Sequence, residues 1–116
     1  MRGCDVPAAE PDALRVVFVT APDAEAGERI ARTLVDERLA ACVNIVPGVR
    51  SIYRWEGRIE EEAEVLLIAK TRADRCDALA GRVRQVHPYA VPEVLALPVA
   101  GGSEPYRAWV AAETRP

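Results

Sequence analysis

Short apolar runs along this chain alternate with longer segments in which apolar residues recur at helical spacing. Residues 14–21 form a β-branched run that is apolar on both faces, which predicts a central strand. Beyond Asp23, apolar residues recur every three or four positions from Ala26 to Leu39. This spacing predicts an amphipathic helix of about four turns, with the side chain of Asp23 capping its N-terminus.

Residues 41–72 predict one long β-hairpin. Strand-favouring residues fill the first half, which is interrupted at Pro47-Gly48 by a predicted bend or bulge and reverses at Glu56-Gly57. The returning half, residues 58–72, is acidic at first and continuously apolar towards its end. We therefore expect the far end of the hairpin to lie in solvent and its near end to enter the core.

A second helix, a strand and a short helix are predicted for the rest of the chain. Thr71 or Asp74 is expected to cap the second helix, which His87-Pro88 ends because proline disfavours helix in the residue before it. Residues 92–99 are predicted to form a strand with Pro92 and Pro98 near its ends, which favours an edge position. Ser103 is expected to cap a short terminal helix whose inward-facing residues are Tyr106, Trp109 and Val110.

The order of these elements, βαββαβ followed by a helix, is that of the ferredoxin-like α+β fold with an antiparallel sheet. A chain of 116 residues is long enough for one such domain. We expect residues 13–116 to form this single domain. Residues 1–12 contain two prolines and few apolar side chains, and we predict a disordered tail there.

Charge and hydropathy exclude several classes of protein. The 15 basic and 18 acidic side chains give a net charge of −3, which argues against binding to nucleic acid. No apolar run approaches the roughly 20 residues that a membrane-spanning helix needs. The first dozen residues lack the apolar core of a secretory signal, so the expected compartment is the cytoplasm.

Three segments carry a resemblance to a known family: AACVNIVPGVRSIYRWEGRIEEEAEVLLIAKTR, VHPYAVPEVLALPV and PYRAWV. Together with the flanking residues they resemble the CutA family of divalent-cation tolerance proteins over residues 14–113. The resemblance implies a small homotrimer, related in architecture to PII signalling proteins and linked to tolerance of copper and other divalent ions. Ala90 stands where the family pattern carries an acidic or polar residue, so a ligand site that uses this position would differ here.

Enzymatic chemistry is not expected. The sequence contains no GxSxG, HExxH, P-loop or GxGxxG motif, and so predicts no organic cofactor. The three cysteines, Cys4, Cys42 and Cys76, have no CxxC spacing, which favours reduced thiols over a disulfide framework or a zinc site.

The groups available for a metal are thiolate and imidazole, which suit Cu(I), Cu(II) or Zn(II) better than Mg(II) or Ca(II). His87, the only histidine, is the first candidate ligand and Cys42 the second. His87 also has a structural interpretation, because a histidine at a helix end often binds terminal carbonyls.

The predicted topology separates these two residues. Cys42 and Lys70 fall at one end of the sheet, and His87 falls at the other, about 20 Å away. One chain therefore cannot use both for one ion, and a shared site would need a neighbouring subunit. Further candidates for ligand binding or a subunit interface are Tyr53, Trp55, Lys70, Tyr89 and Glu93.

Two functional hypotheses remain open from the sequence. One is a metal-binding homotrimer that acts in copper or divalent-cation tolerance. The other is a PII-like signalling module that binds a small ligand in an intersubunit cleft and acts on a partner protein.

Overall fold

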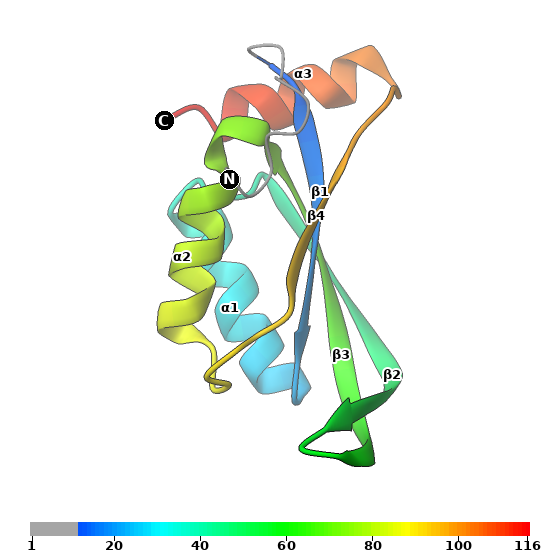
Figure 1. Cartoon of the computed structure of the whole chain (residues 1–116). Helices are drawn as coiled ribbons and strands as arrows, with labels where there is room; N and C mark the ends of the chain where they lie inside the picture. The colour runs from blue at the N-terminus through cyan, green and yellow to red at the C-terminus, as the bar shows by residue number, and fades with distance from the viewer. Residues whose placement is uncertain (1–11) are drawn as a thin grey trace.

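The computed structural model describes residues 12–116, so residues 1–11 of the predicted tail lie outside the described residues. Figure 1 shows the arrangement of the elements. Their order is β1 (Leu14–Ala21), α1 (Ala24–Asp36), β2 (Cys42–Trp55), β3 (Arg58–Arg72), a 3-10 turn η1 (Ala73–Arg75), α2 (Cys76–Val86), β4 (Val94–Pro98) and α3 (Glu104–Glu113). Among the described residues, no helix is both long and apolar enough to cross a bilayer.

The sheet has four strands in the order β2-β3-β1-β4, and its paired strands are all antiparallel. The α+β, ferredoxin-like prediction is therefore confirmed. So are the central position of β1 and the edge position of β4.

One face of the sheet forms the core. Helices α1 and α2 lie side by side against it, as Figure 1 shows. Alternate side chains of β1 and β3 point into this layer and meet the apolar stripes of the two helices. The most deeply buried residues of the layer are Val17, Val19, Ile30, Leu34, Leu67, Leu79 and Val83.

The opposite face of the sheet, here called the open face, carries the other set of alternate side chains. None of the described helices covers its centre, and Leu95 and Leu97 are 60% and 43% exposed. Most of its side chains are apolar and half-buried or exposed. The open face consists of Val16, Phe18, Thr20, Cys42, Asn44, Val46, Leu66, Ile68, Lys70, Leu95 and Leu97.

The hairpin of β2 and β3 extends past the end of β1, where Ala21 pairs with Val65. This extension, residues 49–64, is here called the arm, and it gives the molecule a long axis of 42 Å. The predicted bulge is present as a register shift between Val46 and Val49. The predicted turn is also confirmed, because Glu56 and Gly57 both have positive φ, at 50° and 78°.

Helix α1 ends earlier than the sequence predicts. It stops at Asp36 rather than at Leu39, because Arg38 adopts a left-handed conformation with φ 57°. The amide of Leu39 then bonds the carbonyl of Leu34, and that of Arg38 bonds Val35, which is the Schellman arrangement. Glycine usually marks this position, so the sequence gives no warning of the early stop.

The predicted side-chain caps of α2 and α3 are wrong. Neither Thr71 nor Asp74 caps α2, whose N-cap position is Arg75 with no side-chain hydrogen bond. The Asp74 carboxylate is bound to Arg72 instead, and Thr71 is fully buried at the end of β3. Ser103 does occupy the N-cap position of α3, but its side chain makes no capping bond.

The terminal helix also packs differently from the prediction. Only Val110 of the three expected residues is buried; Tyr106 and Trp109 are 45% and 44% exposed. The helix crosses the end of the sheet and packs through Val110 and Ala111 against Leu14. This contact leaves the Tyr106 and Trp109 rings outside, adjacent to each other with centroids 5.6 Å apart.

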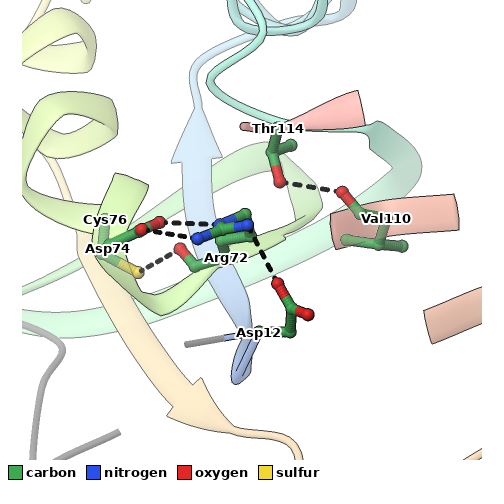
Figure 2. A network of polar contacts seen from close by, with 6 residues as sticks. All are labelled: Asp12, Arg72, Asp74, Cys76, Val110 and Thr114. Carbon is green, nitrogen blue, oxygen red and sulfur yellow. Dashed lines mark hydrogen bonds and ion pairs between the residues drawn. The ribbon is translucent and has the colours of Figure 1, made fainter. Parts of the chain in front are cut away.

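A charged network fixes the end of β3, as Figure 2 shows. The Arg72 side chain is only 10% exposed, and its guanidinium donates to both carboxylate oxygens of Asp74 at 3.0 and 2.8 Å. It also lies 3.0 Å from the carboxylate of Asp12. The first described residue of the chain is thereby joined to the sheet.

Candidate functional site

The structure divides the sequence-predicted site residues between two ends of the sheet. Cys42 and Lys70 are cross-strand partners on β2 and β3, where Lys70 also faces Val16 of β1. His87 bonds Thr20, four residues further along β1. This offset alone corresponds to about 13 Å along the strand. The described residues of one chain therefore do not bring Cys42 and His87 together.

His87 is buried and both of its ring nitrogens are hydrogen-bonded. Nε2 lies 2.7 Å from the carbonyl oxygen of Thr20, and Nδ1 accepts a bond of 3.0 Å from the amide of Tyr89. This pair of partners fits the neutral tautomer with its proton on Nε2. A metal ion at His87 would have to replace one of the two bonds.

Two tyrosines at the His87 end each donate to a glutamate of the arm. The hydroxyl of Tyr53 donates to Glu62 at 2.8 Å, and that of Tyr89 donates to Glu64 at 3.2 Å. The bond to Glu62 raises the pKa of Tyr53 to about 12. Burial, followed by the charge of Glu64, raises the pKa of Tyr89 to about 12. Both phenols stay protonated at neutral pH, so neither serves as a base or as a ready anionic ligand.

The other predicted residues at this end are exposed. Trp55 is 55% exposed at the tip of the arm. Glu93 is exposed just before β4 and has no hydrogen bond or ion pair with a described residue. Ala90 is exposed and supplies no polar group. These positions belong to a surface and do not close a pocket around an ion within one chain.

Four polar side chains gather at the opposite end, on the open face. Cys42 is half-buried, and the hydroxyl of Tyr106 from α3 makes a hydrogen bond with its thiol. Burial of the phenol, together with this neighbour, raises the pKa of Tyr106. The ammonium of Lys70 donates to the side-chain oxygen of Asn44.

Sequence reasoning missed Asn44 and the position of Tyr106. The position of Asn44 could have been predicted from strand alternation, because a residue two positions from Cys42 lies on the same face of the strand. No comparable signal exists for Tyr106, because its approach depends on the direction in which α3 crosses the sheet.

The thiols do not combine into a metal site. Cys42 is half-buried on the open face, whereas Cys76 is buried in the core layer. No group of three or more histidine, cysteine, aspartate or glutamate side chains among residues 12–116 is arranged to hold an ion. A metal ion bound by the described residues would need further ligands from water or from a second chain.

Comparison with known proteins agrees with this architecture. The model of the CutA1 divalent ion tolerance protein family matches residues 15–113. The chloroplastic protein CutA 1 of Oryza sativa is 53% identical over 100 residues, which cover 86% of this chain and 56% of that protein. The chain thus spans little more than half of this relative's length.

A bacterial relative matches almost end to end. The divalent-cation tolerance protein CutA of Thermus thermophilus is 50% identical over 99 residues, covering 85% of this chain and 96% of that protein. A solved structure of the Thermus protein aligns with a TM-score of 0.86 and 49% identity, covering 88% of this chain and 99% of that one. The chain therefore belongs to the CutA1 divalent ion tolerance family.

Proposed function

We propose that this chain acts in the tolerance of divalent cations, as a homotrimer that binds a soft or borderline ion such as copper or zinc. Family membership supports the tolerance role, since the Thermus relative is named a divalent-cation tolerance protein. The observation that carries the metal-binding part is the thiol of Cys42, which lies half-buried on the open face rather than in the core. Thiolate is a strong ligand for these ions.

Assembly is supported by two exposed features of the chain. The open face presents a contiguous set of apolar side chains, of a kind that usually marks a contact surface. The arm is an isolated two-stranded extension, and such ribbons are marginal in water without further contacts. A second copy that covered both would bury this apolar surface. The number three comes from the family resemblance.

Mutation of the open face tests assembly. Ile68→Glu places a charge at the centre of that face, whereas Val35→Glu places one at an exposed apolar position on α1. By light scattering we expect the wild type and Val35→Glu to have three times the 12.6 kDa chain mass. Ile68→Glu should lower this mass, while its far-UV circular dichroism spectrum remains that of the folded wild type. A monomeric wild type at micromolar concentration would refute the assembly.

Cys42 is the preferred ligand in this proposal and His87 the second. The hydrogen bonds of His87 to Thr20 and Tyr89 compete with coordination. Among the described residues, the Cys42 thiol has only the phenol of Tyr106 as a hydrogen-bond partner. Because the two residues lie at opposite ends of one chain, a site that used both would join two subunits.

A copper titration of three variants tests the ligands. Cys42→Ser is expected to weaken copper binding at least tenfold, and His87→Ala to weaken it less. Cys76→Ser is the matched control, since that thiol is 1% exposed, and it should bind as the wild type does. Wild-type affinity should fall below about pH 6, as protons compete for thiol and imidazole. Unchanged binding in both Cys42→Ser and His87→Ala would refute these ligands.

A further inference from the structure

Lys70 is the only lysine in the sequence, and its environment is unlike that of the buried arginine Arg72. It is half-buried on the open face, between Val16 of β1 and Cys42 of β2. Its ammonium donates to the Asn44 side-chain oxygen, yet no carboxylate of residues 12–116 lies within ion-pair distance of it. Arg72, by contrast, is held by two carboxylates.

Two polar side chains at this end of the sheet can donate further hydrogen bonds: Asn44, which Lys70 contacts, and Tyr106, which lies at the neighbouring Cys42. Asn44 uses its oxygen for Lys70, which leaves its amide nitrogen available. Tyr106 brings a hydroxyl whose pKa is raised by burial and by Cys42, so it remains a donor at neutral pH. The hydroxyls of Tyr53 and Tyr89 already donate to glutamates, whereas that of Tyr106 has the thiol of Cys42, a weak acceptor, as its hydrogen-bond partner among the described residues.

The strand neighbours of Lys70 on the open face are not acidic. They are Val16, Cys42, Asn44 and Ile68. A half-buried ammonium among apolar side chains loses hydration that an amide oxygen only partly replaces. A charged acceptor in the same place would be held more strongly than in water, because the surroundings have a lower dielectric constant.

We propose that Lys70, Asn44 and Tyr106 form a binding site for a small oxyanion, a carboxylate or a phosphate group. The ammonium supplies the charge, and the amide and the phenol supply directed donors. The site uses no metal ion, so it does not depend on the metal-binding proposal, although Cys42 lies directly beside it. It does require this end of the open face to admit a small molecule in the assembled protein.

Phosphate and acetate are suitable probes, each titrated into the ¹⁵N-labelled full chain in metal-free Tris buffer and followed by NMR. We expect saturable shifts centred on the Asn44 side-chain amide. Lys70→Met should weaken binding at least tenfold, and Tyr106→Phe should weaken it less. Lys70→Arg should retain binding, since it keeps the charge. Arg29→Met removes an exposed positive charge from α1 and should change the affinity less than twofold.

Two results would overturn the proposal. The first is the absence of saturable shifts with either anion in the wild type; if Lys70→Met then also dissociates the oligomer, the counter-charge of Lys70 is a carboxylate of a neighbouring copy. The second is equal anion binding in the wild type and Lys70→Met. Failure of the copper titration would leave both readouts unchanged, so the two proposals fail separately.

Discussion

Replacement of Asp74 by alanine is expected to destabilise the protein by about 2 kcal/mol at pH 7. The carboxylate accepts two bonds from Arg72, whose side chain is only 10% exposed and cannot be fully rehydrated when its partner is lost. Hydrogen bonds to a charged group contribute about 1.5–3 kcal/mol each, so two of them would contribute at least about 3 kcal/mol. Because Asp74 is 48% exposed and Arg72 keeps Asp12 in the variant, we expect a smaller loss of about 2 kcal/mol.

Urea unfolding at fixed protein concentration measures this loss. For a slope of about 2 kcal/mol per molar urea, the midpoint should fall by about 1 M. Asp36→Ala, at an exposed position in the last turn of α1, is the control and should change stability by less than about 0.5 kcal/mol. Equal midpoints for the wild type and Asp74→Ala would show that the Arg72 network contributes nothing.

The pH dependence gives a second check on the same network. The bond from Arg72 lowers the pKa of Asp74 below its ordinary 3.8. Because the folded-state pKa is lowered, the stabilisation is fully present above the unfolded-state pKa and is lost as pH falls through the folded-state value. The difference between wild type and Asp74→Ala should therefore persist from pH 7 to about pH 5 and shrink below pH 3.8. A difference that stayed constant down to pH 3 would refute the ion pair as its cause.

Further predictions concern the core and the arm. Gly27→Ala should destabilise the fold by about 1 kcal/mol in thermal unfolding, because its new methyl would lie 2.8 Å from the Val65 side chain; Val65→Ala should relieve this. Gly81→Ala, which meets nothing closer than 3.7 Å, should instead stabilise by about 0.5–1 kcal/mol. Glu62→Gln should return the pKa of Tyr53 from about 12 towards 10, measured by ultraviolet titration, and an unchanged value would refute the bond.

The spacing of apolar residues predicted the strands, the sheet class and the central position of β1, and the prolines of β4 predicted its edge position. The edge position of β2 was not predicted. The Glu56-Gly57 turn and the Pro47-Gly48 bulge were also predictable, since residue type restricts the backbone there. The early end of α1 was not, because Arg38 adopts a conformation that its residue type does not favour.

Side-chain partners were harder to predict than elements. Asp74 was a reasonable helix cap by sequence, but Arg72 two residues earlier binds its carboxylate first. Tyr106 and Trp109 were expected inside because they are aromatic, and they lie outside because α3 packs through Val110. The conformation of such side chains depends on which of several alternative partners binds them. The local sequence does not determine which partner that is.

The sequence placed Cys42 and His87 at opposite ends of the sheet because strand direction and length fix that separation. It gave no indication that both nitrogens of His87 are bonded, since Thr20 lies 67 residues earlier in the chain. The hydrogen bonds of His87 therefore make Cys42 the preferred ligand, in contrast to the order that the sequence predicts.

Native mass spectrometry of copper-treated protein reports assembly and metal content together. We predict a complex of three chains that retains copper, and a Cys42→Ser complex of the same three chains that retains much less. A wild type that remains a single chain would contradict the proposed trimer. So would a Cys42→Ser trimer that holds as much copper as the wild type.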